Sequence, residues 1–366
     1  MNYNKLNIKQ IIIPFVDFDI FFSFLPTSLR SFIYVQNNIV MFRTNMKKYR
    51  NTLNFGLIIA SLVASNLSFA EIPQELKLDY AYYAPTSLVV KNQKLLEKAL
   101  PNTKIKWVFS QGSNRSLEYL NSGSVDFAST AGLAAALSRA NGSPIKTIYI
   151  QSQPEWTALL VPTNSPIKNL QDLKGKKIAA TKGTDPYLFT LQALETVGLD
   201  KNDVQLVHLQ HPDGKIALER KQVDVWAGLD PLMASAQLQS GAKPLYRNVG
   251  FNSYSVLSVK DQFAKQSPEA IEAVIQAYEQ ARKWAKANPD KMAELLAKEA
   301  KLPNNVAKLQ LSRTNFDQNI PTTKHIVALQ KAGKILTEED LVRKGTDTNK
   351  VIQQLFDAQY AKKVVK

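Results

Sequence analysis

From residue 76 onward, short apolar runs alternate with longer segments in which apolar and polar residues mix. Each short run ends in a polar or Pro/Gly-rich turn, which is typical of a strand that leads through a turn into a helix. The first four predicted strands are residues 76–81, 105–109, 125–128 and 146–150. Regular alternation of strand and helix predicts parallel sheets with helices on both faces.

The same pattern starts again at residue 157. The second set of predicted strands is residues 157–161, 177–181, 204–209, 223–227 and 243–246. Two α/β sets of similar size, with no repeated sequence between them, predict two lobes. We expect the chain to cross between these lobes near residues 155–160 and 248–256.

After a further strand at residues 254–259 the chain becomes helical. Ser267-Pro268 predicts a helix start, with Ser267 as the N-cap and the proline in the first turn. Apolar residues at helical spacing between 271 and 285 form one broad face, which we interpret as core packing. We expect these helices to return to the first lobe. The predicted division is lobe 1 at residues 71–156 and 253–366, and lobe 2 at residues 157–252.

Residues 46–70 have the three parts of a secretory signal peptide. A basic stretch at 46–50 precedes an apolar run at 53–67, and Ser68-Phe69-Ala70 gives small residues at positions −3 and −1 of a cut before Glu71. The alternative is an N-terminal core helix. A membrane anchor is disfavoured, because the apolar run is shorter than the ~20 residues that span a bilayer.

Residues 1–45 contain apolar runs that Asp17 and Asp19 interrupt. Each of these aspartates would cost about 3 kcal/mol at the centre of a membrane. The segment shows no helix caps and no sustained period. Since a signal peptide must stand at the N-terminus, we expect Met46, or alternatively Met41, to be the true start. Residues 1–45 are then untranslated or disordered.

Composition narrows the class of protein. Residues 1–70 hold seven of the 46 Lys and Arg residues and two of the 31 Asp and Glu residues, so the remaining 296 residues carry 39 and 29, a formal charge of +10. The lysines are scattered rather than clustered, which does not favour nucleic-acid binding. The chain has no cysteine, which excludes disulfides, cysteine-bound metal, thiol catalysis and the acylated cysteine of a lipoprotein.

The sequence shows no catalytic signature. It has three histidines, at 208, 211 and 325, and no H-E-x-x-H, G-x-S-x-G, P-loop or G-x-G-x-x-G motif. Scattered acids and bases could still catalyse a reaction, but the pattern favours a binding protein without cofactor or metal. We expect His208, inside a predicted strand, to be a core or hinge residue.

Four turns between a strand and a helix are candidates for a ligand site. In open α/β sheets, ligands bind at the carboxyl ends of the strands, where helix N-termini offer free N–H groups and a partial positive charge. Ordinary N-capping is the alternative for any single turn. The candidate turns are residues 112–115, 129–132, 183–185 and 212–214.

Two aspartates precede a proline, in Asp185-Pro186 and Asp230-Pro231. Such an aspartate can cap its own helix and would repel an anion from it. We therefore expect the anionic group of a ligand on lobe 1 and its organic part on lobe 2. The expected anion contacts are Ser113, Asn114, Ser129 and Thr130, and those to the organic part are Tyr187, His211 and Trp226. The other candidate ligand contacts are Tyr82, Tyr83, Thr86, Trp156, Thr184, Asp185 and Asp230.

Several segments together resemble one family. They are L-N-S-G-S-V-D-F at 120–127, N-S-P-I-K-N-L-Q-D-L-K-G-K-K at 164–177, K-G-T at 182–184, W-A-G-L-D-P at 226–231 and W-A-K-A-N-P at 284–289. In this order they are similar to the ABC-transporter substrate-binding proteins of the aliphatic sulfonate, taurine and nitrate group. The resemblance runs from about residue 76 to 297, and more loosely to the C-terminus.

The resemblance implies a two-lobed type II periplasmic-binding-protein fold that closes around one ligand. It implies a free periplasmic monomer that delivers an organosulfonate, as a source of sulfur, to an inner-membrane permease with its ATPase. Many relatives have Ser-Ser-Ala where this chain has Thr184-Asp185-Pro186, and an aromatic residue where it has Leu229. A sulfate ester, taurine or nitrate therefore stays open as the ligand.

Two other classes of protein stay open as well. The pyrimidine-synthesis enzymes of thiamine metabolism share this fold, but the resembling enzymes use a cysteine-rich motif in the cytoplasm. The absence of cysteine and the predicted signal peptide disfavour them. A ligand-sensing or structural envelope protein would be recognised by the absence of transporter genes beside its own.

Overall fold

The computed structural model describes residues 33–36, 39–42 and 72–365. The chain divides into two compact units, residues 1–69 and 70–366. Among the helices that the structure describes, none is both long and apolar enough to cross a membrane.

The first unit contains one described pair of strands. β1 (Ile33–Gln36) and β2 (Ile39–Phe42) pair antiparallel. The hydrophobic pattern predicts no element there, so this pair is a difference from the sequence analysis. The predicted signal peptide at residues 46–70 and the expected start at Met46 lie outside the described residues and stay predictions.

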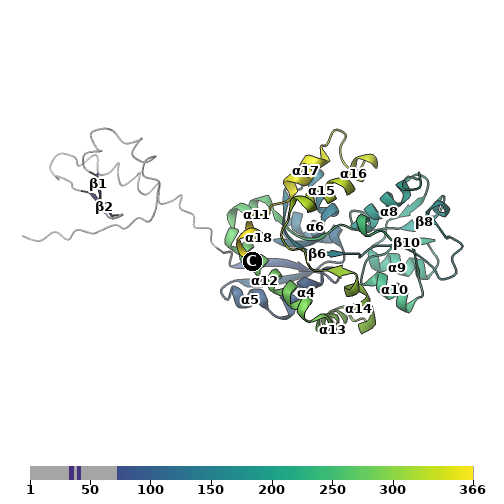
Figure 1. Ribbon diagram of the computed structural model, residues 1–366, viewed down its shortest axis with the longest axis horizontal. Helices are drawn as coiled ribbons and strands as arrows, with labels where there is room; N and C mark the ends of the chain where they lie inside the picture. The colour runs from purple at the N-terminus through teal and green to yellow at the C-terminus, as the bar shows by residue number, and fades with distance from the viewer. Residues whose placement is uncertain (1–32, 37–38, 43–71, 366) are drawn as a thin grey trace, which may run out of the picture. The chain divides into compact units, whose positions relative to one another are not determined.

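The first lobe of the second unit is built on a six-stranded sheet (Figure 1). In spatial order its strands are β13 (Thr314–Asn315), β6 (Ile145–Pro154), β12 (Ser255–Lys260), β5 (Phe127–Ala131), β3 (Glu75–Tyr80) and β4 (Lys104–Phe109). β3 is parallel to β4 and β5, whereas β12 is antiparallel to β5 and to β6. β6 therefore points the same way as β3, β4 and β5, and the short β13 runs antiparallel to β6.

The second lobe repeats this design in a five-stranded sheet. In spatial order its strands are β11 (Lys243–Tyr246), β7 (Leu159–Val161), β10 (Val225–Ala227), β8 (Lys177–Ala179) and β9 (Gln205–Val207). β8 is parallel to β9 and β10, and β7 is antiparallel to both of its neighbours. Four of the five strands again point the same way.

Two connections join the lobes, one from β6 to β7 and one from β11 to β12. The first, residues 155–158, falls within the predicted range 155–160, and the second, residues 247–254, overlaps the predicted range 248–256. The predicted fold class, two mostly parallel α/β lobes joined by two crossovers, is confirmed. We place the lobe limits inside these connections, after residues 156 and 252, as the sequence analysis proposes.

Helices follow the strands in the predicted alternation. Those of lobe 1 are α4 (Pro85–Asn92), α5 (Leu95–Ala99), α6 (Ser113–Ser122) and α7 (Gly132–Ala140). Those of lobe 2 are α8 (Asp185–Glu195), α9 (His211–Glu219) and α10 (Leu232–Gln239), with 3-10 turns η1 (Leu170–Leu173) and η2 (Val249–Phe251). One predicted helix ending at Leu100 is divided into α4 and α5, because Lys94 adopts a left-handed conformation with φ 52°.

The C-terminal part of the chain is helical, as expected. Its helices are α11 (Asp261–Gln266), α12 (Pro268–Ala287), α13 (Pro289–Ala300), α14 (Asn304–Ser312), α15 (Thr323–Ala332), α16 (Ile335–Glu338), α17 (Thr348–Leu355) and α18 (Gln359–Val364). The apolar face of α12 is buried against α4 and β6, which confirms its interpretation as core. Ser267 occupies the N-cap position and Pro268 opens the helix, as predicted, although the Ser267 side chain makes no cap hydrogen bond.

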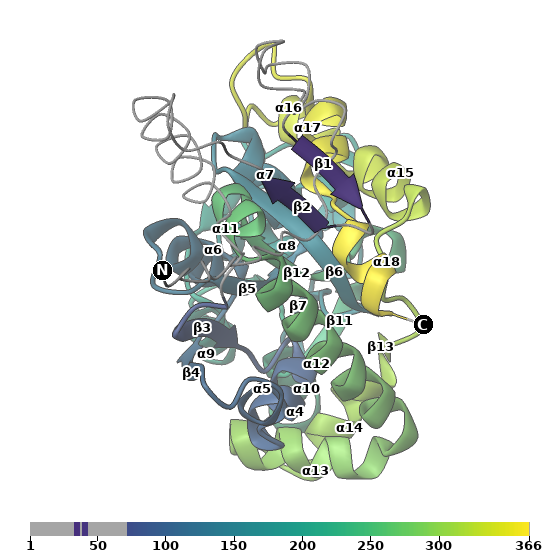
Figure 2. The ribbon, with the colours of Figure 1, turned by 90° about the vertical axis from the view of Figure 1, so that its left-hand side faces the viewer.

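Among the C-terminal helices, α13–α14 and α15–α17 form two groups that lie on opposite sides of lobe 1 in both views (Figures 1 and 2). α14 contacts α10, and α16 contacts α8. Both groups therefore reach lobe 2, although the sequence pattern assigns them to lobe 1 alone.

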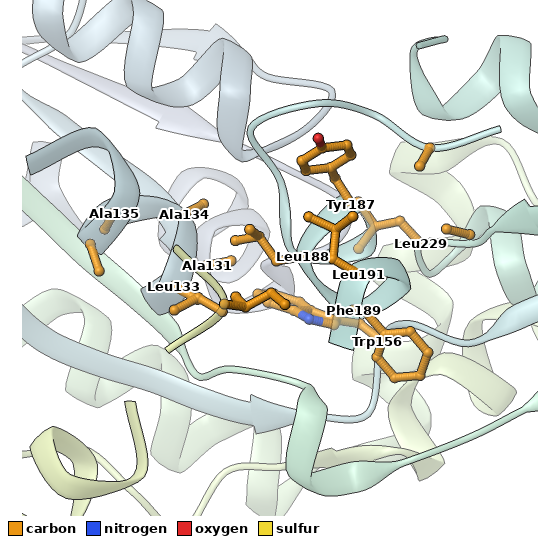
Figure 3. Close-up of a cluster of buried hydrophobic side chains, with 14 of the residues drawn as sticks. Ala131, Leu133, Ala134, Ala135, Trp156, Tyr187, Leu188, Phe189, Leu191 and Leu229 are labelled. Atoms are coloured by element: carbon orange, nitrogen blue, oxygen red, sulfur yellow. The ribbon is translucent and has the colours of Figure 1, made fainter. Parts of the chain in front are cut away.

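One apolar cluster crosses the boundary between the lobes. Ala131 and Leu133, at the start of α7, belong to the same cluster as Leu188 and Leu191 of α8, and the four side chains are shown in Figure 3. Burying a leucine side chain contributes about 2 kcal/mol. The lobes therefore share a core where α7 meets α8.

Candidate functional site

The carboxyl ends of the parallel strands in both sheets lead into the turns that the sequence analysis singled out. In lobe 1, β4 leads to α6 and β5 to α7; in lobe 2, β8 leads to α8 and β9 to α9. Hydrogen bonds reach these turns across the lobes: Asn114 donates to Gln210, and Trp156 of the first crossover donates to Asp185. The predicted turns therefore face one another at the junction between the lobes.

The N-termini of the helices at this junction have no side-chain caps. This holds for α4, α6, α8 and α9. The first N–H groups of α6, from Ser113 onward, have no partner within their helix, and they carry the positive end of the helix dipole. α7 differs, because Gly132 N–H donates to the carbonyl of Tyr254 and Leu133 N–H donates to Ser253 Oγ. The start of α6 is therefore better suited to an anion than the start of α7.

Asp185 is held by residues of both crossovers. Its carboxylate accepts hydrogen bonds from Trp156 Nε1 at 3.0 Å, from Ser253 N at 2.8 Å and from Ser253 Oγ at 2.8 Å. The predicted capping of its own helix is wrong, because Thr184 occupies the cap position and the carboxylate points to the crossover. Burial raises the pKa of Asp185 to about 6, although these hydrogen bonds oppose the shift. We call Trp156, Asp185 and Ser253 the hinge cluster.

Tyr83 extends the hinge cluster into lobe 1. Its ring lies edge-on to Trp156, with centroids 5.9 Å apart, and its hydroxyl donates to the carbonyl of Ser129 at 2.8 Å. Burial raises the pKa of Tyr83 far above its usual value. Two candidates from separate turns, Tyr83 and Trp156, thus meet at the hinge cluster.

His211 opens α9 and is fully buried. Its Nδ1 lies 3.1 Å from Thr181 Oγ1, which donates its own proton to the carbonyl of Leu209. Nδ1 must therefore carry the proton of the neutral ring, and Nε2 is left as an acceptor. Nε2 has no partner among the described residues. Burial lowers the pKa of His211 to about 3.

His211 faces Gly112 of lobe 1. A Cβ added at Gly112 would lie 2.8 Å from His211 Nε2 and 3.0 Å from Asn114 Oδ1. Beside them, Asn114 Nδ2 donates to Gln210 Oε1 at a long 3.5 Å. We call Gly112, Asn114, Gln210 and His211 the mouth.

Asp79 supports the mouth from inside lobe 1. Its buried carboxylate accepts from Ser110 Oγ at 2.7 Å, Ser116 Oγ at 2.5 Å and Ser129 N at 2.7 Å. Burial raises the pKa of Asp79 to about 6 against these hydrogen bonds. Sequence reasoning missed this residue, although an aspartate inside an apolar strand was a visible signal.

Three candidates have side chains inside a lobe rather than at the junction. Ser129 and Thr130 belong to β5, which is buried on both faces, and Thr130 Oγ1 lies 3.5 Å from Ser258 Oγ. Trp226 belongs to the core of lobe 2, against Gly214. Strand alternation sends such residues into the core on either side. The contacts described for these three side chains all lie within their own lobe, so their predicted ligand contacts stay predictions.

The other candidates are held by their own lobe or by the C-terminal helices. Thr86 Oγ1 donates to Gln151 Oε1 at 2.8 Å, and the carbonyl of Tyr82 accepts from Gln310 Nε2 at 2.8 Å. Tyr187 is buried, and its ring lies edge-on to His208, with centroids 5.6 Å apart. His208 follows β9 and is exposed, so the predictions that it lies within the strand and belongs to the core are wrong. The remaining candidates, Ser113 and Thr184, donate to nearby backbone or accept from it.

Asp230 joins the lobes a second time. Its Oδ1 accepts from Ala234 N at 2.9 Å, so the predicted capping of α10 is confirmed, and its Oδ2 lies 3.4 Å from Arg313 Nη1. Arg313 also donates to Gln237 on α10. Burial raises the pKa of Asp230 to about 7, while Arg313 opposes the shift. Sequence reasoning missed Arg313, since its partners lie more than 70 residues away.

Two surface hollows of about 480 Å³ lie elsewhere. One is lined by residues such as Pro162, Lys176 and Leu218 of lobe 2, and the other by residues such as Asn121 and Lys260 of lobe 1. Neither includes a candidate ligand contact. Within residues 72–365 and the two short strands before them, no group of three or more acidic or histidine side chains could hold a metal ion.

Comparison with known proteins gives consistent results. A family model described as NMT1/THI5 like matches residues 102–292. The chain is 30% identical over 302 residues to a protein of Escherichia coli (strain K12) that is named as an aliphatic sulfonates-binding protein. The match covers 82% of this chain and 94% of that protein.

Solved structures show the same fold. The periplasmic aliphatic sulphonate binding protein SsuA from Escherichia coli has a TM-score of 0.66 at 29% identity, covering 78% of this chain and 92% of that chain. SsuA from Xanthomonas axonopodis pv. citri, bound to MOPS, has a TM-score of 0.72 at 24% identity, covering 78% and 99%. The desulfurization enzyme DSZB shares the fold at 15% identity, with a TM-score of 0.59 and coverage of 80% and 99%. The chain belongs to the NMT1/THI5-like family, with the two-lobed fold of the sulfonate-binding proteins.

Proposed function

We propose that this protein is the substrate-binding component of an ABC importer and captures an aliphatic sulfonate between its two lobes. The observation that carries the proposal is the match to the Escherichia coli relative named for aliphatic sulfonates, which spans 94% of that protein and so includes both lobes. The ligand would supply sulfur to the cell.

The geometry of the junction supports an anionic ligand. The uncapped start of α6 presents N–H groups beside Asn114, and an anion at a helix N-terminus gains about 0.3–2 kcal/mol. The hinge cluster and the mouth lie at the two ends of this junction. We propose that the sulfonate lies at the start of α6 and that the organic part extends toward Trp156 and Tyr83.

We propose binding rather than catalysis, although an enzyme shares the fold. The titratable groups of the junction are each engaged within the protein: Asp185 by the hinge cluster, Asp230 by Arg313, and His211 Nδ1 by Thr181. Thr181 Oγ1 donates its proton to the carbonyl of Leu209 and accepts from His211 Nδ1, so His211 does not act as a base toward this hydroxyl. To test this part of the proposal, the protein is incubated with sulfonates, which are then analysed by mass spectrometry. We expect the sulfonates to remain chemically intact, and release of sulfite would contradict the proposal.

We further propose export to the periplasm through the signal peptide at residues 46–70, with cleavage before Glu71. A chain without cysteine has no residue for lipid attachment, so the exported protein would be free in the periplasm. We propose that it acts as a monomer that meets the permease and its ATPase. Mass spectrometry of the protein from cells should find Glu71 at the N-terminus. Peptides from residues 1–45 would contradict the proposed start at Met46.

A thermal-shift panel tests the ligand class. The purified protein is heated with alkanesulfonates, taurine, an alkyl sulfate ester, sulfate and nitrate. A ligand at 100 times its Kd stabilises the native state by about 2.7 kcal/mol, which raises Tm by several degrees. We expect the largest shifts with alkanesulfonates. A shift with nitrate or sulfate but with no organosulfonate would overturn the proposal in favour of a small-anion binder.

A further inference from the structure

The mouth lies at the edges of both sheets that are farthest from the crossovers. β4 and β9 are the terminal strands of their sheets, whereas the crossovers leave from β6, β7, β11 and β12 near the opposite edges. Gly112 follows β4 and His211 follows β9. A contact at this place can form only when the two lobes have swung together.

The contact is tight and depends on a glycine. Gly112 has an extended backbone with φ −176°, which any residue can adopt, so the backbone does not require glycine. Space does, because a Cβ would lie 2.8 Å from Nε2 and 2.9 Å from Cδ2 of His211. The His211 ring cannot swing aside freely, since Nδ1 is tied to Thr181.

The charge on His211 matters for the same contact. The charged groups nearest along the chain do not face the ring: Arg115 on α6 pairs with Glu118 at 2.7 Å, and Lys182 and Asp213 are exposed. Thr181, Gly112 and Asn114 carry no charge. Burial is the single cause that lowers the pKa of the ring. No described side chain offers the ring an anionic partner, so in the ligand-free protein a second proton would place a buried, unpaired charge at the mouth.

Resting on the proposed function, we propose that Gly112 and His211 form the closing contact of the two lobes, and that closure requires a neutral His211. The protein then holds its ligand at neutral pH and releases it in acid. The sign follows from linkage. An exposed imidazole titrates near pH 6.5, and closure lowers that pKa, so the closed state is fully favoured above about pH 6.5 and is lost progressively below it.

The first test measures affinity for ethanesulfonate at pH 7.5 and pH 5.0 by calorimetry. One linked proton predicts about 30-fold weaker binding at pH 5.0. His211→Gln, which keeps a neutral polar side chain, should lose this pH dependence, so that its affinities at pH 7.5 and pH 5.0 differ by no more than a few-fold. Equal pH dependence in both proteins, or tighter binding in acid, would overturn the proposal.

The second test adds a methyl group at the contact. Gly112→Ala should weaken binding about tenfold or more, because the extra carbon keeps the lobes apart. Gly112→Ala/His211→Ala should restore most of the affinity, since the smaller side chain makes room. Gly132→Ala is the matched control, because its Cβ would meet nothing closer than 3.5 Å at the start of another helix. Failure of the double variant to recover, with an unchanged Tm, would contradict a closing contact.

A third readout needs no ligand and separates this proposal from the ligand assignment. The chain has no cysteine, so Arg115→Cys and Lys182→Cys can carry spin labels at exposed positions that flank the mouth. We expect their dipolar coupling to weaken between pH 7.5 and 5.0, and not in the His211→Gln background. If ethanesulfonate does not bind but this transition occurs, the proposed ligand fails and the closing contact stands. If ethanesulfonate binds but this transition does not occur, the proposed ligand stands and the closing contact fails.

Discussion

At the hinge cluster, Asp185 accepts three hydrogen bonds of 2.8 to 3.0 Å, and an apolar core continues from α7 into α8 beside it. At the mouth, one hydrogen bond of 3.5 Å joins Asn114 to Gln210, and His211 Nε2 has no partner among the described residues. The two ends of the same junction thus differ in how firmly they are joined. Fully satisfied buried groups resist separation, whereas a weak contact costs little to open. The contrast is that of a fixed hinge and a mouth that can part.

Asp185→Ala should have the largest effect on stability. Removing the carboxylate leaves the Trp156 and Ser253 donors buried without an acceptor, and each such group costs about 1–3 kcal/mol. We expect the free energy of unfolding to fall by about 3 kcal/mol in urea titrations at pH 7.5. Asp213→Ala, at an exposed position on α9, is the matched control and should change it by less than about 0.5 kcal/mol. Similar losses of unfolding free energy in Asp185→Ala and Asp213→Ala would contradict the contrast between a firm hinge cluster and a weakly joined mouth.

Arg313→Ala should come next. It leaves Asp230 buried without its cation, at a cost of about 2 kcal/mol, and the pKa of Asp230 should rise further above about 7. Lys308→Ala, which breaks an exposed pair with Asp290, is the control and should change little. Urea titrations of both variants at pH 8 check this. An Arg313 variant as stable as its control would mean that α14 does not help to hold the lobes together.

Asp79→Asn tests how the buried carboxyl group of Asp79, which supports the mouth from inside lobe 1, contributes to stability at different pH values. The folded-state pKa of Asp79 is raised to about 6 from an unfolded value near 3.9, so its contribution to stability is present below pH 4 and is lost as the pH rises through 6. Relative to wild type, the variant should therefore gain about 2–3 kcal/mol in unfolding free energy between pH 4 and pH 7.5. Asn can still accept from Ser129 N. A constant difference across this range would mean that the carboxyl group does not titrate with folding.

Asn114→Ala should have the smallest effect on stability. Its loss removes one long hydrogen bond, so the free energy of unfolding should stay within about 0.5 kcal/mol of wild type, while sulfonate affinity falls. Asn121→Ala, at an exposed position on the same helix, is the control and should change neither. Calorimetry with ethanesulfonate and urea titrations give both quantities.

Ser129→Ala tests the prediction from the sequence that Ser129 contacts the anionic group of the ligand. A strong loss of affinity would support a direct contact, although the Ser129 side chain is buried in lobe 1.

The alternation of strands, turns and helices was readable from the sequence, because each turn carries Gly, Pro or a small polar residue at the end of an apolar run. The antiparallel direction of β7 and β12 was not, because apolar runs do not encode strand direction. The C-terminal helices were expected to return to lobe 1, but nothing local to α14 or α16 reveals contact with α10 or α8.

For the site, sequence reasoning found turns that meet at the junction between the lobes, but not the contacts that their side chains make there. Tyr83, Asn114, Trp156, Asp185 and His211 do lie at the junction. Which oxygen or nitrogen faces the other lobe depends on long-range partners, such as Ser253 for Asp185, 68 residues away. Ser129 and Thr130 were chosen for their hydroxyls, but β5 is covered on both faces, so their side chains pack inside lobe 1.

The position of β12 has a consequence for how the protein folds. β12 lies between β5 and β6 in the sheet of lobe 1, yet it follows the whole of lobe 2 along the chain. As the polypeptide emerges from its N-terminus, the edges of β5 and β6 cannot pair with their common neighbour until residues 255–260 appear. Lobe 2 is continuous and needs no such later segment for its sheet. We therefore expect lobe 2 to form first and lobe 1 to be completed around its last central strand.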